Sequence, residues 1–326
     1  DEDWKLRLSL NRKINTNRKA IKEFPDRETV LSVARANPNP PVTRVLFRGN
    51  PHVPQDEVSP GFPELFQSEP PTIPQPKSDA KTAGRRKVLA AWLTSPENRM
   101  TARVMVNRVW QFHFGRGIVR SSNNFGQLGS PPTHPELLDY LAAQFATNGW
   151  KLKALHKRIM TSQAYQMSSS MNEAGFAKDS DNDLFWRFDV RRLSAEEVRD
   201  SLLAVNGSLN PKLYGPSIYE KLPQEVLARQ SVPGKGWGNS SEEERNRRSI
   251  YIHVKRSLLT PILSVFDLPD TDHSCEARFT TLQPGQALSL LNSEFVHTQA
   301  KRLATRIRQT IDGGARQKLI AAFKLV

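Results

Sequence analysis

Residues 101–141 read TARVMVNRVWQFHFGRGIVRSSNNFGQLGSPPTHPELLDYL. Two helical patterns flank a polar connector that is rich in glycine. Thr101 is expected to cap a helix that runs to Phe114, and Gly115 then supplies the left-handed residue that commonly follows a helix end. Thr133 and Glu136 fit the T-x-x-E capping box of the next helix, which should end near residue 148. This stretch therefore predicts a helical domain.

Outward from this stretch, the sequence predicts a mainly α fold with a small β element. Further helices are expected over 85–93, 152–164 and 194–206, the last with a capping box of Ser194 and Glu197. Three more should follow, one opened by Pro284, one after His297 and one after Gly314. Alternation of apolar and polar residues predicts short strands at 42–48 and 249–254.

The N-terminal part differs in composition from the rest. Residues 1–36 are charged and compatible with a helix, and twelve of the 23 prolines lie between Pro25 and Pro76. Proline removes a backbone donor and restricts the residue before it, so this segment should be extended. We therefore expect a charged helix and a proline-rich extended arm over 1–80, followed by an irregular multi-helix main domain over 81–326.

Charge and composition limit the classes of function. The chain has 47 Lys and Arg against 33 Asp and Glu, a formal net charge of +14. Such a balance is compatible with an anionic partner, but the basic residues are scattered in pairs such as Arg191–Arg192 and Lys301–Arg302, which is typical of a solvated surface. Nucleic-acid binding is therefore the weaker interpretation. No run approaches the roughly eighteen apolar residues of a membrane span.

Cys275 is the single cysteine of the sequence. One cysteine cannot form an internal disulfide, a CxxCH haem attachment or a multi-cysteine zinc site. The sequence begins at Asp1 without an initiator methionine and ends at Val326 within a helical pattern. We therefore expect it to be a fragment of a longer parent protein.

His113, His134, Glu136 and Asp139 are the candidate catalytic residues. His113 shares an apolar helix face with Val106 and Trp110, which fits a core histidine as well as a catalytic one. An imidazole and two carboxylates near a helix start suit proton transfer. The competing interpretation assigns Glu136 to helix capping and Asp139 to the helix dipole, which leaves His134 unexplained.

A second candidate cluster follows a predicted turn. A weak candidate for a metal site with mostly oxygen ligands consists of Asp267, Asp270, Asp272 and His273. The segment lacks the residue order of an EF-hand. Cys275 near Arg278 is a candidate for an activated thiol. The alternative is an ordinary structural loop, because Asp and Pro are common turn residues.

Several ordered motifs carry a family resemblance. They read NRVWQ at 107–111, FGRGIV at 114–119, PPTHPELLD at 131–139, RRLSAEE at 191–197 and QALSLLN at 286–292. With these motifs, and over about 42–307, the sequence resembles the domain of unknown function 1553, the planctomycete-specific C-terminal domain of planctomycetes and verrucomicrobia.

The resemblance implies a context but no reaction. Proteins of this kind carry an upstream cytochrome c-like domain, so haem c is expected on that domain and no cofactor in this chain. They have secretion signals, which implies an extracytoplasmic location, the periplasm or cell envelope. Their genes lie beside sulfatases, which makes an anionic glycan a candidate partner. The family has no agreed catalytic residues.

Three functions follow from the sequence and the resemblance. The first is a non-catalytic binding or scaffold module of an extracytoplasmic, cytochrome-linked protein, with a role in polysaccharide use. The alternative is a catalytic domain that acts on carbohydrate through a pocket of His113, His134, Glu136 and Asp139. Nucleic-acid binding through the basic surface is the third. Whether the chain is an enzyme is left open by the sequence.

Overall fold

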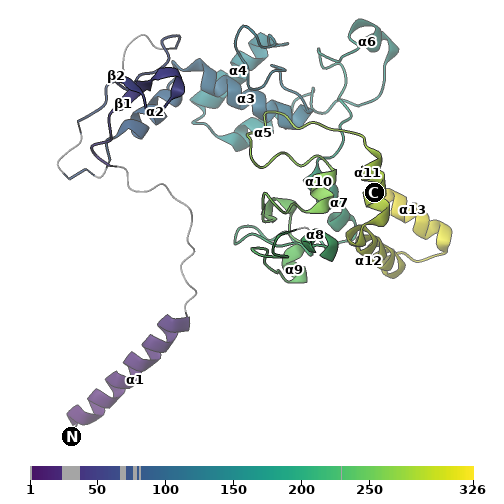
Figure 1. The fold of residues 1–326 in the computed structure, drawn as a ribbon. Coiled ribbons are helices and arrows are strands. Elements are labelled where there is room, and N and C mark those ends of the chain that lie inside the picture. Colours follow the sequence, from purple (N-terminus) through teal and green to yellow (C-terminus); the bar gives the residue numbers. More distant parts are fainter. Residues whose placement is uncertain (1, 24–36, 67–70, 76–78, 81, 229) are drawn as a thin grey trace. The chain divides into compact units, whose positions relative to one another are not determined.

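The computed structural model describes residues 2–23, 37–66, 71–75, 79–80, 82–228 and 230–326 (Figure 1). The chain contacts divide it into two units, Asp1–Asn98 and Arg99–Val326. Among the described residues, thirteen α-helices and one two-stranded sheet form the regular structure, which confirms the mainly α fold with a small β element. The predicted division at residue 80 stays a prediction.

Unit 1 contains α1 (Glu2–Glu23), β1 (Thr43–Leu46), η1 (Phe47–Gly49), β2 (Pro54–Val58) and α2 (Arg85–Leu93). The strand predicted at 42–48 is β1, which pairs antiparallel with β2. The sequence did not predict β2, because Pro54 and three polar residues hide its pattern. In the proline-rich arm, the ring of Phe62 stacks on Trp92 of α2 with 4.5 Å between ring centroids. The predicted helix at 85–93 is α2.

Unit 2 contains the remaining helices. They are α3 (Arg99–Phe114), α4 (Pro135–Thr147), α5 (Leu152–Met160), α6 (Glu173–Lys178), α7 (Ala195–Val205), α8 (Gln224–Ala228), α9 (Glu242–Arg245), η2 (Ser249–Tyr251), α10 (Pro261–Val265), α11 (Pro284–Asn292), α12 (Glu294–Thr310) and α13 (Ala315–Leu325).

The first core of unit 2 lies between α3, α4 and α5. Its centre is aromatic: Trp110 stacks on Phe114, and Phe185 meets both rings edge-on. Apolar residues at helical spacing, among them Val106, supply the rest of the core. Gly115 follows α3 with a φ of 80°, the left-handed conformation that glycine adopts without steric cost.

The second core lies between α7, α10 and neighbouring loops, with Phe295 and Val296 of α12 packed against it. Ser194 and Glu197 form the predicted capping box of α7, in which the Ser194 side chain accepts from the Glu197 amide and the Glu197 side chain accepts from the Ser194 amide. Two buried arginines stabilise the long loops around this core. Arg199 and Arg247 are 1% and 0% exposed, and both donate to backbone carbonyls of residues 212–216 or 245–247.

The capping box predicted for Thr133 and Glu136 is wrong. His134 is the N-cap of α4, and its side chain makes no capping hydrogen bond. Pro135 takes the first helical position, where its missing N–H costs nothing, so Glu136 stands one position too early to close the box. The Thr133 amide instead donates to the carbonyl of Ile118.

The strand predicted at 249–254 is also wrong. Ser249–Tyr251 form a 3₁₀ turn, and Ile252 makes an isolated parallel bridge with Ile218. Ser249 and Ile252 are buried whereas Ile250 is 74% exposed, so the burial repeats every three residues. That is the period of a 3₁₀ helix, and over so short a stretch it resembles the alternation of a strand.

Three helix ends differ from those predicted. α3 begins at Arg99, so Thr101 lies inside it rather than at its cap. α5 ends at Met160, where the hydroxyls of Thr161 and Ser162 donate to carbonyls of the last turn. α12 begins at Glu294, three residues before His297, because Ser293 caps it. Among the described residues, no helix is long and apolar enough to cross a membrane.

Candidate functional site

His113 faces a second histidine. It lies one residue before the end of α3, and its Nε2 is 2.8 Å from Nδ1 of His156 on α5. The ring of Tyr165 meets His113 edge-on. Burial first, and the neighbouring His156 second, hold the pKa of His113 below its usual value. The two rings thus share one hydrogen bond, and His113 favours the neutral form.

The other three predicted residues lie around the start of α4. His134 is half-buried, its Nδ1 is 3.1 Å from the hydroxyl of Thr133, and its ring packs against Phe185. Asp139 makes an ion pair with Arg103 of α3. Glu136 is exposed in the first turn of α4. The described part of the chain includes His113, His134, Glu136 and Asp139. No side-chain hydrogen bond or ion pair described there joins one of these four residues to another.

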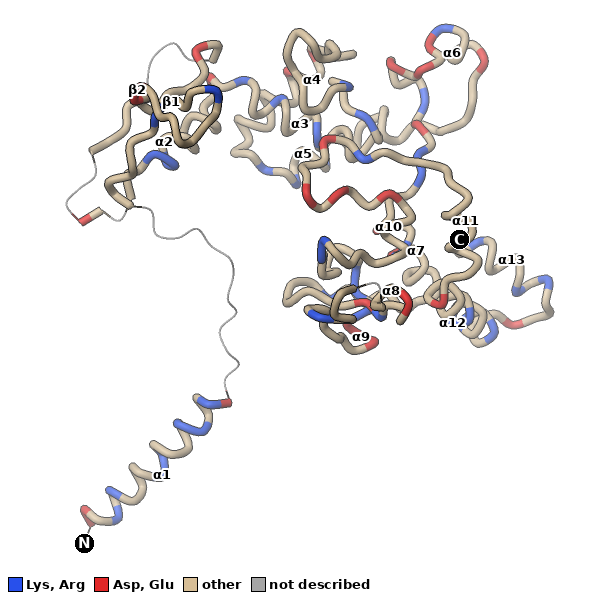
Figure 2. Tube along the Cα trace, in the orientation of Figure 1, with Lys and Arg blue, Asp and Glu red and all other residues tan. Residues whose placement is uncertain are grey.

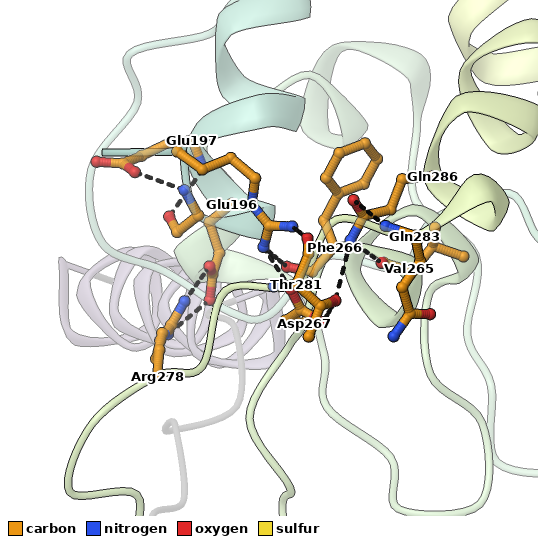
Figure 3. Close-up of polar contacts among 11 residues, drawn as sticks. Glu196, Glu197, Val265, Phe266, Asp267, Arg278, Thr281, Gln283 and Gln286 are labelled. Carbon is orange, nitrogen blue, oxygen red and sulfur yellow. Dashed lines mark hydrogen bonds and ion pairs between the residues drawn. The ribbon is translucent and has the colours of Figure 1, made fainter. Parts of the chain in front are cut away.

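The loop that connects α10 to α11 contains the second predicted cluster. Figure 3 shows the polar contacts around the first residue of that cluster, Asp267. Asp267 is the anchor of the loop and has a left-handed φ of 62°. Its Oδ2 accepts from Arg192 at 2.5 Å and from the Thr281 amide at 2.8 Å, while Oδ1 accepts from the Thr281 hydroxyl. These donors, with the Thr281 amide the strongest, hold the pKa of Asp267 below its usual value. Both carboxylate oxygens are therefore engaged within the protein.

Two further ion pairs surround this anchor, both involving residues at the start of α7. Glu196 pairs with Arg278 of the loop through both carboxylate oxygens. Glu197 pairs in the same way with Arg191, and this hydrogen bonding, together with the Ser194 amide, lowers the pKa of Glu197 to about 2. The family-like stretch 191–197 thus fixes the loop through two arginine–carboxylate pairs, Arg192–Asp267 and Glu196–Arg278, while the Arg191–Glu197 pair lies within the stretch itself. This favours the structural interpretation of the loop.

The remaining candidates of the loop are on its exposed side. Asp270 accepts from the amide of Asp272, and Asp272 pairs with Arg256. Cys275 is exposed, and its Sγ lies 3.2 Å from the carbonyl of Ala277. In the ranges that the structure describes, no three His, Cys, Asp or Glu side chains are placed to hold a metal ion. A metal site in this loop and an activated thiol at Cys275 remain predictions.

A different surface has the geometry of a binding site. One face of α12 presents Thr298, Lys301, Arg302, Thr305, Arg306 and Gln309, which recur every three to four residues. Together with Asn206 and Gly207 at the end of α7, they line a shallow depression open to solvent. The opposite face of α12 is apolar and packs inward, with Ile307 6% exposed. The fold therefore fixes this face toward solvent.

The three cations of this depression differ in their partners. Arg306 donates to the Val205 carbonyl at 2.6 Å, and Arg302 pairs with Glu242 of α9. The Lys301 side chain is exposed, and its ammonium group makes no hydrogen bond or ion pair with any residue that the structure describes. Figure 2 shows the acidic residues of α9 and the basic residues of α12. Thus Lys301 keeps its full capacity for an external anion, and Arg302 is held by a surface carboxylate.

The sequence interpretation missed this face. It treated Lys301 and Arg302 as one of several scattered basic pairs. Arg306 lies four residues after Arg302, one helical turn along the same face, and this spacing was the available signal. His156 lies within the helix predicted over 152–164, but it was not recognised as the partner of His113, because the two lie 43 residues apart.

Comparison with known proteins gives a family and no function. No curated protein and no solved structure matches the chain significantly. The model of a family described as protein of unknown function (DUF1553) matches residues 85–326. That range contains both cores, the α10–α11 loop and the basic face of α12, and confirms the resemblance seen in the sequence motifs. The chain therefore belongs to the PSD1 family of proteins of unknown function (DUF1553).

Proposed function

We propose that this chain is a non-catalytic binding module whose ligand is an anionic glycan, and that it binds the glycan on the basic face of α12. The observation that supports this most directly is the row formed by Lys301, Arg302 and Arg306 along an open depression. Three cations within two helical turns suit a ligand with repeated negative charges. An arginine guanidinium matches the oxygens of a sulfate or carboxylate group with two parallel donors.

The neutral residues of the depression favour a sugar over other polyanions. Thr298, Thr305 and Gln309 offer hydroxyl and amide groups, which pair with sugar hydroxyls. No aromatic ring is among the residues that line this depression in the described chain, whereas binding of single-stranded nucleic acid generally uses aromatic stacking. Duplex recognition needs a longer row of cations along the phosphate backbone.

The parent protein belongs to the same proposal. We infer from the family resemblance that the module follows a cytochrome c-like domain, which would hold the haem, and acts outside the cytoplasm in polysaccharide use. In that arrangement the α12 face would keep the cytochrome-bearing protein near an anionic glycan. The net charge of +14 supports attraction to such a polymer.

Equilibrium binding to matched polymers tests the proposal. The full 326-residue chain is titrated with dextran sulfate, with neutral dextran of the same length and with duplex DNA, each at two salt concentrations. The proposal predicts binding to dextran sulfate that weakens with salt, because screening shortens the reach of exposed charges. Equal binding to neutral dextran would contradict the proposal. Tighter binding to DNA than to dextran sulfate would show that the site binds nucleic acid instead.

The catalytic alternative retains one specific observation. The His113–His156 pair holds a neutral imidazole beside Tyr165, and such a group can accept a proton near neutral pH. His134 and Asp139 are held in other local contacts, Glu136 is exposed, and none of the three adds a contact to that pair. Turnover of a sulfated or neutral oligosaccharide that disappears in His113→Gln but persists in His134→Gln would favour this alternative.

A further inference from the structure

We propose that Glu242 acts as an internal competitor for the anionic ligand at Arg302. This inference rests on the proposed binding of an anionic glycan to α12. Glu242 is the first residue of α9, and its carboxylate pairs with the Arg302 guanidinium at the edge of the depression. A ligand that uses Arg302 must therefore displace Glu242.

The Glu242–Arg302 ion pair can separate at a small cost in free energy. The side chain of Glu242 is 64% exposed and that of Arg302 is 30% exposed. Both charged groups therefore stay in contact with water, and neither needs the other to compensate for burial. Exposed ion pairs contribute little to stability, and water can replace either partner. The guanidinium keeps a second contact when Glu242 leaves, since Arg302 Nη1 also lies 3.5 Å from Oε1 of Gln299. Displacement of Glu242 thus leaves Arg302 positioned for a ligand.

The neighbouring cations decide which anions can compete. Exchange of the Glu242 carboxylate for one ligand carboxylate at Arg302 gives no net gain of ion pairs. A ligand gains only if further charges reach Lys301, whose ammonium group has no partner among the described residues, and Arg306, one turn away. Glu242 therefore selects against single anions and in favour of a chain with closely spaced charges, such as a sulfated glycan.

Glu243 provides the matched control. It is the next residue of α9, it is exposed, and its side chain makes no hydrogen bond or ion pair with a described residue. Glu242→Gln and Glu243→Gln remove the same charge from the same short helix. Long-range attraction of a polyanion should increase equally in both variants, so any excess in Glu242→Gln reports the local competition.

The test measures affinity of the full chain for dextran sulfate and for inorganic sulfate. Glu242→Gln should bind dextran sulfate about twofold to fivefold more tightly than Glu243→Gln, the range expected from releasing one exposed ion pair. The ratio of the affinity for dextran sulfate to the affinity for inorganic sulfate should also be smaller in Glu242→Gln than in Glu243→Gln. In an Arg302→Ala background the excess should vanish, since the pair is already broken.

Equal affinity of the two glutamine variants would overturn the role of Glu242 while leaving the binding proposal intact. An excess that persists in the Arg302→Ala background would overturn it as well. Absence of dextran sulfate binding in the wild-type chain and in every variant would contradict the proposed function, and the competition with it. Thermal unfolding of each variant checks that α9 and α12 remain folded.

Discussion

Arg199 of α7 and Glu220 form an ion pair in the interior of unit 2, where their side chains are 1% and 9% exposed. Arg199 also donates to the carbonyls of Arg245 and Arg247 and to the hydroxyl of Ser249. Burial is the largest influence on Glu220 and raises its pKa despite the nearby guanidinium. A single side chain thus connects α7 to two distant segments, one at Glu220 and one over 245–249.

Replacement of Arg199 by alanine should destabilise the protein strongly. Removal of one partner of a buried ion pair leaves an uncompensated charge and typically costs about 3–5 kcal/mol. The free energy of unfolding in urea, measured for Arg199→Ala, checks this. Lys153→Ala on α5 is the control, because Lys153 is exposed and has no partner among the described side chains. A loss below about 1 kcal/mol in Arg199→Ala would show that the loops are held by other contacts.

Gly117 should not tolerate a side chain. A Cβ at this position would lie 2.5 Å from the Val119 carbonyl and 2.6 Å from the Asn107 side chain. Asn107 is fully buried and bonds both the amide and the carbonyl of Val119, so it cannot move away without losing them. Gly117→Ala should cost about 1–3 kcal/mol of unfolding free energy. Gly285→Ala in α11, where nothing lies within 4 Å, should be neutral or stabilising.

The Arg191–Glu197 pair predicts a specific acid sensitivity. The pKa of Glu197 falls from 4.5 to about 2 in the folded chain, chiefly through hydrogen bonding to Arg191. Its stabilising contribution is therefore complete above pH 4.5 and is lost as the pH falls toward 2. The difference in unfolding free energy between wild type and Glu197→Gln, measured from pH 6 to pH 2, should shrink over that window. A difference that is constant with pH would contradict the assignment.

The His113–His156 pair predicts a titration visible by NMR. Burial and His156 both lower the pKa of His113, and burial is the larger cause. His156→Gln should raise the pKa of His113 but leave it below the unfolded value of 6.5. The folded chain should lose stability as the pH falls below 6.5, because the unfolded chain then binds a proton more readily. A His113 pKa unchanged by His156→Gln would argue against the pairing.

Local signals in the sequence predicted most of the fold. Ser194 with Glu197, Pro284 and Gly115 mark helix ends through hydrogen bonds or backbone angles that a single chain segment determines. The prediction at Thr133 was wrong because Pro135 moved the helix start by one position. The strand predicted at 249–254 was wrong because burial of Ser249 and Ile252 depends on contacts with distant segments, Asp200 of α7 and Ile218.

The candidate site was less accessible to sequence reasoning. His113 and His156 are in contact only because α3 and α5 pack on one core. No local sequence pattern predicts this packing. The Asp267 anchor depends on Arg192, 75 residues away, and the Glu242–Arg302 pair spans 60 residues. Contacts between side chains so far apart in the sequence depend on tertiary packing. The spacing of Lys301, Arg302 and Arg306, by contrast, could be seen in the sequence.

The most direct test of the account is the affinity of the full chain for dextran sulfate in two charge-reversal variants. Lys301→Glu places a negative charge in the depression, whereas Lys153→Glu makes the same change in net charge on α5. The account predicts that Lys301→Glu weakens binding at least about tenfold, and that Lys153→Glu changes it by less than about twofold, because screening confines the effect to nearby charges. Equal weakening in both variants would contradict a site on α12.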